Sequence, residues 1–265
     1  MTVSGPDRSI APPPRLSVLL AAQAPVGIVF RRGPSRTVRV IHWDRTQDVF
    51  TPGATFRGRI YTDRSDISPD GRHMIYFAMG GAAWAIAGAG YTWTAISEAP
   101  SVTALSLWGP GDTWGGGGYF LSNDSYWLES DGNTSLIRDN APLRRETNIK
   151  NRTFPSALDR DGWINRSPTR WDTLYEKELI HDWLLRAAGE PRRYELEQRG
   201  RAPQPCPNWE WAGWDRNRLV WAESGCLRAA SLEPEGLSIT STLIDFSTTP
   251  APNTAADSTS SRAES

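Results

Sequence analysis

Lysine is almost absent from this chain of 265 residues, and cysteine, histidine and methionine are scarce. The two lysines, Lys150 and Lys177, leave 27 of the 29 basic side chains as arginine, which is typical of a GC-rich genome. Because 30 acidic side chains balance the basic ones, the net charge of −1 excludes the basic surface of a dedicated nucleic-acid-binding protein. No apolar run approaches the roughly 20 residues that cross a bilayer, so we expect no membrane association.

The cysteines and histidines indicate neither a disulfide framework nor a metal site. Cys206 and Cys226 are too few for a framework, and neither belongs to a Cys-x-x-Cys pair or stands beside a histidine. The histidines share no ligand spacing; they are His42, His73 and His181. We therefore expect reduced thiols, no metal, no cofactor and a cytoplasmic protein.

The two ends of the chain differ in composition from its body. Residues 1–14 are rich in proline and residues 247–265 in Ser, Thr and Ala, so both tails are predicted to be disordered. Residues 16–24 mimic a short signal peptide, but their apolar part of about seven residues is at the lower limit of such segments. The alternative, which we prefer, is that 16–22 begins the folded domain, predicted to span 15–246.

The body carries the pattern of an all-β protein. Short apolar runs separated by Gly, Pro, Asp and Asn predict about a dozen strands and no long helix. Residues 37–43 illustrate the alternation, with Arg39 and His42 pointing away from the apolar side chains between them. The stretch 171–185 also fits helical spacing, but the alternation that follows at 194–198 favours two strands, at 173–177 and 183–188.

A turn phrase recurs along the body. At 65–77 the sequence Ser-Asp-Ile-Ser-Pro-Asp-Gly-Arg-His-Met-Ile-Tyr-Phe predicts a strand, a tight turn and a second strand. Residues 211–221 repeat this pattern more weakly, a degraded copy begins at 104–108, and a further copy is predicted around 158–164. A period of roughly 40 to 50 residues with four strands each is the signature of a β-propeller, here with four to six blades and most simply five.

The Ser-Pro-Asp-Gly-Arg phrase at 68–72, followed by an apolar strand, resembles the repeat of TolB-type and WD-like propellers. More loosely, residues 16–246 resemble a group of uncharacterised bacterial proteins with such repeats. This resemblance implies a fold and no activity. A propeller must also protect its terminal sheet edges, and we expect the run at 26–30 to complete the blade formed by 219–246.

Few residues point to chemistry. The glycine run at 115–118 lacks the lysine and the helix of a phosphate-binding loop, and no nucleophile elbow or dinucleotide fingerprint is present. Three aspartates near equivalent ends of the repeats are candidates for the converging carboxylates of a propeller-type glycoside hydrolase. They are Asp66, Asp112 and Asp215. Asp beside Pro or Gly also stabilises turns, so catalysis is the less favoured alternative.

Tryptophan is the one abundant aromatic residue, with 13 copies. Most are expected to pack between the sheets, but an exposed Trp beside Arg would form a protein-binding hot spot or a sugar-stacking platform. The candidates for such a surface are Trp43, Trp114, Trp209 and Trp211. The sequence therefore predicts a β-propeller that acts as a non-catalytic protein-interaction or scaffold module, with a glycoside hydrolase or a carbohydrate-binding propeller as the alternative.

Overall fold

The computed structural model describes residues 12–33, 36–81, 88–110, 115–129, 134–147, 157–167, 169, 173–189 and 191–247. The predicted disordered tails therefore lie largely outside the described residues. Pro14 is already buried, one residue before the predicted start of the domain, and Ser247 is exposed, one residue after its predicted end.

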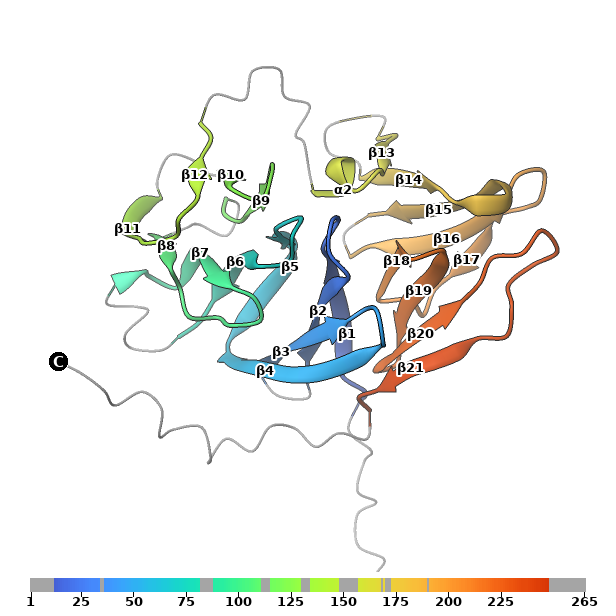
Figure 1. Cartoon of the computed structure of the whole chain (residues 1–265), viewed down its shortest axis with the longest axis horizontal. Coiled ribbons are helices and arrows are strands. Elements are labelled where there is room, and N and C mark those ends of the chain that lie inside the picture. Colours follow the sequence, from blue (N-terminus) through green and yellow to red (C-terminus); the bar gives the residue numbers. More distant parts are fainter. Residues whose placement is uncertain are drawn as a thin grey trace, which may run out of the picture.

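The chain forms five β-sheets, which are antiparallel except for the parallel pair β10 and β12 (Figure 1). Sheet A contains β1 (Arg15–Leu20), β2 (Val26–Arg32), β3 (Thr37–Asp44) and β4 (Val49–Arg57). Sheet B contains β5 (Arg59–Ile67), β6 (His73–Met79), β7 (Thr92–Glu98), β8 (Ser106–Gly109) and β11 (Ser135–Asp139). Sheet C contains β9 (Gly118–Phe120), β10 (Ser125–Leu128) and β12 (Arg144–Arg145).

Two further sheets follow a single helical turn, α2 (Ala157–Arg160). Sheet D contains β13 (Ile164–Asn165), β14 (Leu174–Glu178), β15 (Trp183–Ala188), β16 (Arg193–Gln198) and β17 (Gln204–Cys206). A 3-10 turn, η1 (Ile180–Asp182), joins β14 to β15. Sheet E contains β18 (Trp211–Asp215), β19 (Arg218–Glu223), β20 (Cys226–Ala230) and β21 (Ser241–Asp245). The all-β prediction is confirmed, and so is the choice of strands over a helix in the ambiguous stretch.

The turn phrase forms the hairpin between β5 and β6, as predicted. The Gly71 amide donates to the carbonyl of Ser68 at 2.8 Å, and Gly71 has a φ of 76°, which a residue without a side chain adopts easily. The copy at 211–221 forms the hairpin between β18 and β19, where Arg216 and Asn217 both have positive φ. The copy predicted around 158–164 is wrong in part, because residues 157–160 form α2.

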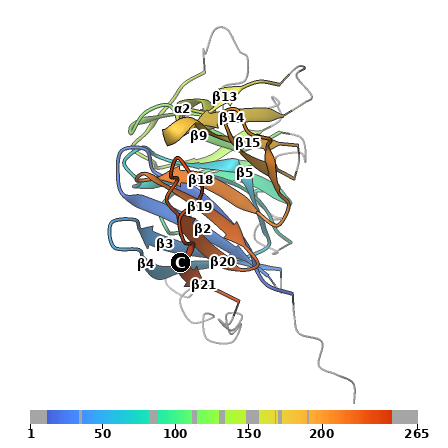
Figure 2. The same cartoon turned by 90° about the vertical axis from the view of Figure 1, so that its right-hand side faces the viewer.

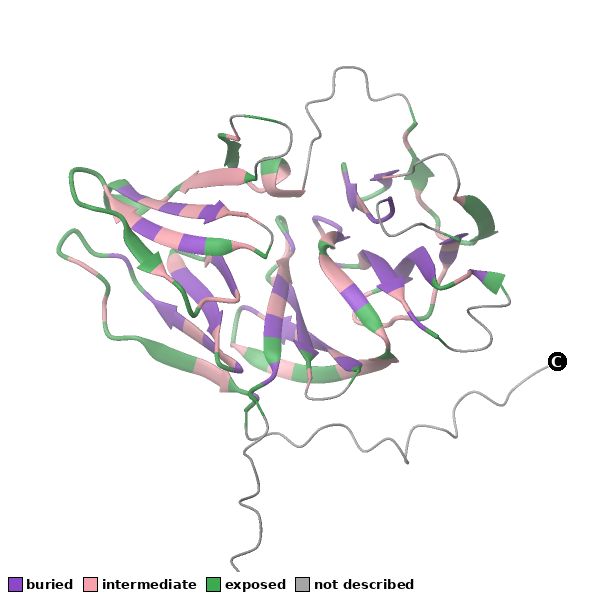
Figure 3. Ribbon diagram, turned by 180° about the vertical axis from the view of Figure 1, so that it is seen from behind, coloured by how far each residue is buried: buried purple, intermediate pink, exposed green. Residues whose placement is uncertain are grey.

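Buried side chains lie between neighbouring sheets. One apolar cluster joins sheets A and B, a second joins A and E, a third joins D and E, and a fourth joins B and C. The outer strands β4, β11 and β21 contain no buried residue, whereas inner strands such as β3, β6 and β19 are mostly buried (Figure 3). The inner strands of sheets A, B and E therefore have apolar side chains on both faces, because a neighbouring sheet packs against each face.

The first and last sheets lie beside each other (Figure 1; Figure 2). Our expectation that 26–30 would complete the sheet of 219–246 is wrong, because β2 pairs with β1 and β3 and sheet E is built from its own four strands. The two sheets are joined by side chains instead: Val29 and Trp43 of sheet A pack with Val220 and Leu227 of sheet E. Among the described residues, no helix is long and apolar enough to cross a membrane.

Candidate functional site

Two adjoining cavities lie where the first strands of several sheets come together. The first, which we call the inner hollow, has a volume of about 600 Å³ and is lined by β1, β5, α2 and β18, with single side chains from sheet D. The second, which we call the arginine cleft, has a volume of about 660 Å³ and is lined mainly by the starts of β1 and β5 and by the segments 191–194 and 207–211. Both volumes fall within the range of ligand sites.

Six residues line both cavities and so form the boundary between them: Ser17, Thr62, Asp63, Arg192, Tyr194 and Trp211. Arg192 Nη2 lies 3.7 Å from Asp63 Oδ1 and also bonds the Tyr194 hydroxyl. Burial raises the pKa of Tyr194 against the opposing effect of the Arg192 guanidinium, so this hydroxyl stays protonated at neutral pH. The boundary therefore contains one cation, one carboxylate, the neutral phenol of Tyr194 and two aliphatic hydroxyl groups.

Asp66 lines the inner hollow, but its carboxylate is fully engaged. Its Oδ2 accepts from the Phe120 amide at 2.7 Å and from Arg160 Nη1 at 2.7 Å, and its Oδ1 accepts from Arg160 Nη2 at 3.0 Å. Burial raises the pKa of Asp66, and the paired guanidinium and the amide oppose that rise. Only 2% of the side chain is exposed, so Asp66 connects β5, β9 and α2 and has no free oxygen for a substrate.

The other two carboxylates of the inner hollow also have arginine partners. Asp161 accepts from Arg160 Nε at 2.8 Å, and Asp63 faces Arg192. Lys177 lies in the same wall, and its Nζ donates to the Asp161 carbonyl at 2.6 Å. Burial lowers the pKa of Lys177, while the nearby Asp161 carboxylate opposes that shift. Each of these three carboxylates thus lies beside an arginine, and Asp66 and Asp161 share Arg160.

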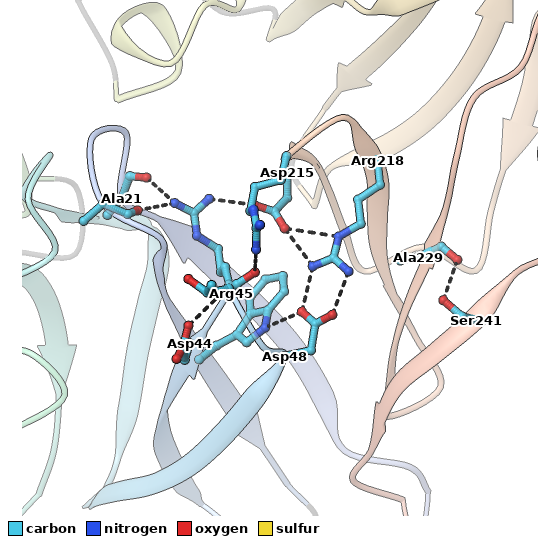
Figure 4. A network of polar contacts seen from close by, with 12 residues as sticks. Ala21, Asp44, Arg45, Asp48, Asp215, Arg218, Ala229 and Ser241 are labelled. Atoms are coloured by element: carbon cyan, nitrogen blue, oxygen red, sulfur yellow. Dashed lines mark hydrogen bonds and ion pairs between the residues drawn. The ribbon is translucent and has the colours of Figure 1, made fainter.

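Asp215 lies at the junction of sheets A and E rather than in the lining of the inner hollow (Figure 4). It accepts from Arg45 Nη1 at 2.9 Å and from Arg218 Nη2 at 2.9 Å, and its side chain is fully buried. Arg218 also forms a bidentate salt bridge with Asp48, with both N–O distances at 2.7 Å. Arg45 in addition donates hydrogen bonds to the carbonyls of Ala21 and Ala24. This network is a structural connection between β18 and the β3–β4 turn.

The predicted tryptophan surface is only partly present. Trp43 is fully buried, so its prediction as a surface residue is wrong; it stacks on Phe50 and donates from Nε1 to Asp48 Oδ1 at 3.1 Å. Trp211 is also buried but lines both cavities, and half-buried Trp209 lines the arginine cleft while stacking on Trp221 at 5.0 Å. The remaining two candidates, Asp112 and Trp114, lie outside the described residues.

Most of the charged residues that line the two cavities cannot be recognised in the sequence. Arg160, Arg192 and Tyr194 have no local motif, and single arginines do not stand out in a chain with so many. Lys177 carried the one usable signal, since lysine is so rare in this chain. Among the described residues, no group of three or more His, Cys, Asp or Glu is arranged to hold a metal ion.

Comparison with known proteins adds no functional information. No family model matches the chain, and no curated protein matches it in sequence. Among solved structures, the uncharacterized protein lmo1340 from Listeria monocytogenes EGD-e aligns with a TM-score of 0.25 and 8% sequence identity, over 88% of this chain and 84% of that one. A similarity this low carries no argument about fold or function.

Proposed function

We propose that the five sheets are the blades of a five-bladed β-propeller and that the protein is a non-catalytic module that binds another protein. The ring is supported by apolar clusters at four of its junctions, which are A with B, B with C, D with E, and E with A. At the remaining junction Arg160, which directly precedes sheet D, bonds Asp66 of sheet B and the Phe120 carbonyl of sheet C.

The ring can be tested by hydrogen exchange on the full chain. In a closed propeller the amides of β2 and β19 have neighbours on both faces, so we expect them to exchange as slowly as those of β6 and β7 in the middle of the chain. Faster exchange of both terminal sheets than of sheet B would indicate an open stack of sheets and would overturn the closed ring.

One observation carries the non-catalytic assignment. A glycoside hydrolase needs one carboxyl group as acid and a second as base or nucleophile, both open to the substrate. Asp66 and Asp215 are buried, and arginine donors occupy the oxygens of both carboxylates. Asp63 and Asp161 are also paired with arginine.

The test is reciprocal affinity purification from the native host together with a panel of glycan substrates. We expect one partner protein to be recovered with either member of the pair as bait, and no glycan to be hydrolysed. Hydrolysis that is lost in Asp66→Asn or Asp63→Asn would overturn the proposal. Absence of a reciprocal partner would also contradict it.

A carbohydrate-binding propeller is the second candidate, favoured by Trp209 and Trp211 in the lining of the arginine cleft. Tryptophan faces beside arginine are a common sugar platform. One face of Trp209 is covered by Trp221, which reduces the stacking area open to a sugar. Binding of neutral oligosaccharides on a glycan array, lost in Trp209→Ala, would favour this candidate over the protein partner.

A further inference from the structure

The arginine cleft carries a strong excess of positive charge in a protein whose net charge is −1. Among the described residues, two carboxylates line it, those of Asp63 and Glu210. Its cations come from sheets A and B and from the β15–β16 connection and the start of β16, and they are Arg15, Arg32, Arg59, Arg64, Arg192 and Arg193. The balance of charge favours an anionic occupant, because a cavity lined by one sign of charge concentrates ligands of the opposite sign.

The two carboxylates of the cleft are already used within the protein. Glu210 Oε2 accepts the Leu16 amide at 2.7 Å, and thereby attaches the segment before β18 to β1. Asp63 lies opposite Arg192 at the boundary with the inner hollow. The described residues show no ion pair for Arg15, Arg32, Arg59 or Arg193, all of which are exposed. Arg15 lies near Glu210, and its charge opposes the rise that burial causes in the pKa of that carboxyl group. Four guanidinium groups of the cleft therefore remain available to a ligand.

Two of these arginines oppose each other within sheet A. Arg15 and Arg32 are paired in register between the antiparallel strands β1 and β2. Like charges directly opposite on neighbouring strands destabilise a sheet, and a bound anion would remove that repulsion. The two arginines are not needed to hold β1 in the fold, because the buried side chains of Leu16 and Val18 already anchor that strand in the core.

The cleft also offers aromatic and apolar surface between its cations. The Tyr61 ring lies 4.3 Å from the Arg59 guanidinium carbon and 5.9 Å from that of Arg64. These contacts orient the guanidinium groups in advance, which lowers the entropic cost of binding. Half-buried Trp209 and exposed Pro191 and Pro207 complete the rim.

We propose that the arginine cleft binds an acidic segment of the partner protein, in which Asp or Glu side chains alternate with apolar ones. The carboxylates would pair with Arg15, Arg32, Arg59 and Arg193. The apolar side chains would pack on the exposed prolines and on the part of Trp209 that Trp221 does not cover. This occupant is favoured over a polyphosphate or an acidic glycan because neither has apolar side chains for that surface. A nucleic acid is disfavoured by the net charge of −1, which gives the protein no extended basic surface beyond the cleft. The inference rests on the proposed function, since it names the chemistry of the protein partner.

A random peptide display library selected on the full-length protein tests the inference. We expect the enriched peptides to be rich in Asp and Glu and to be lost on the double variant Arg59→Glu with Arg193→Glu. The matched control is Arg72→Glu with Arg199→Glu, which changes the net charge equally at two exposed arginines outside the cleft. If the first double variant does not fold, as judged by its melting curve, Arg32→Glu with Arg193→Glu replaces it.

Fluorescence anisotropy then measures the affinity of one selected peptide, synthesised with its acidic residues and again with Asn and Gln in their place. The cleft variant and the amide peptide should each weaken binding at least about tenfold, the control variant should not, and added salt should weaken binding by the acidic peptide. Polyphosphate, duplex DNA and oligogalacturonate serve as competitors and should bind more weakly than the peptide.

Several outcomes would overturn the inference: no enrichment, enrichment without acidic residues, equal binding by the cleft variant, or tighter binding of any of the three competitors. These outcomes are distinct from failure of the proposed function. A reciprocal partner that binds wild type and the cleft variant equally would support the protein-binding role and overturn the arginine cleft as its site. Glycan hydrolysis would overturn the protein-binding role whatever the peptides show.

Discussion

Arg45 and Asp215 are separated by 170 residues, yet Nη1 of the arginine lies 2.9 Å from Oδ1 of the aspartate at the junction of the first and last sheets. Both side chains are almost completely buried. Arg218 holds the other oxygen of Asp215 and extends the network to Asp48 on the β3–β4 turn. The two ends of the domain are thus joined by charged side chains as well as by the apolar cluster of sheets A and E.

Asp215→Ala should destabilise the protein strongly, because it leaves Arg45 buried without its counter-ion. We expect a loss of about 3 to 5 kcal/mol in the free energy of unfolding, measured by urea titration. Glu146→Ala is the matched control, because it removes a half-exposed partner from the exposed Arg144 and should cost less than about 1 kcal/mol. Equal effects of the two substitutions would show that the Asp215 network does not hold the sheets together.

Asp48→Asn should change how stability depends on pH. The side-chain hydrogen bonds and charge of Arg218 lower the pKa of Asp48 below its ordinary value, although partial burial opposes them. A carboxyl whose pKa is lowered on folding contributes stability above its unfolded pKa of about 3.9, and that contribution is lost as the pH falls through the folded pKa. Asp48 has a φ of 55°, and Asn adopts positive φ as readily as Asp, so the substitution adds no backbone strain.

The melting temperatures of wild type and Asp48→Asn should therefore differ most at neutral pH and converge as the pH falls below about 4. A constant difference from pH 7 to pH 3 would mean that the Asp48 carboxylate contributes no charge-dependent stability. Thermal melts followed by circular dichroism at several pH values provide the measurement.

Trp43→Ala should show that this tryptophan is part of the core rather than of a binding surface. Its ring is fully buried against Phe50, and truncation of such a residue typically costs about 3 to 5 kcal/mol. Tyr91→Ala, at a residue that is 64% exposed, is the control and should change stability by no more than about 0.5 kcal/mol. A folded Trp43→Ala variant of wild-type stability would contradict the packing between sheets A and E.

A comparison of Gly71→Ala with Gly162→Ala should separate two contributions to the loss of stability: the strain of a positive φ and the steric clash of the new Cβ atom. Gly71 and Gly162 have nearly the same positive φ, 76° and 79°, and both backbones disfavour a side chain. A Cβ at Gly71 would lie 2.8 Å from the Cβ of Val26, whereas a Cβ at Gly162 would meet nothing within 4 Å. Urea titration should therefore show a larger loss for Gly71→Ala than for Gly162→Ala, and equal losses would mean that Val26 moves away without cost.

Local patterns in the sequence predicted most of the strands that the structure contains. The alternation at 194–198 and the turn phrase at 68–72 depend on neighbours a few residues away, and both took the predicted conformation. The segment around 158–164 was misassigned because its Asp-Arg-Asp-Gly sequence fits a β-turn, while the structure closes it as one helical turn before Gly162. There the arginine at the end of α2 contacts sheets B and C, an interaction that no local pattern encodes.

The candidate site was less accessible to sequence reasoning than the fold. The sequence predicted that Asp66 and Asp215 lie near strand ends, and they lie near the ends of β5 and β18. Their burial and their arginine partners, which the sequence does not reveal, engage both carboxylates within the protein. The sequence did not predict the arginine cleft, because its six arginines share no motif that distinguishes them from the other arginines of the chain. Only folding brings these six to one cavity.

The sequence by itself determined the all-β class, the positions of the main hairpins and the absence of a basic character overall, because each depends on composition or on short-range spacing. Only the tertiary structure decided which charges are neutralised and which remain open. A carboxylate and a guanidinium interact over a few ångströms, so the partner of Asp215 is fixed by the approach of two sheets that are distant in sequence. The same packing brings Arg15, Arg32, Arg59 and Arg193 to one cleft, where the described residues show no ion pair for any of them.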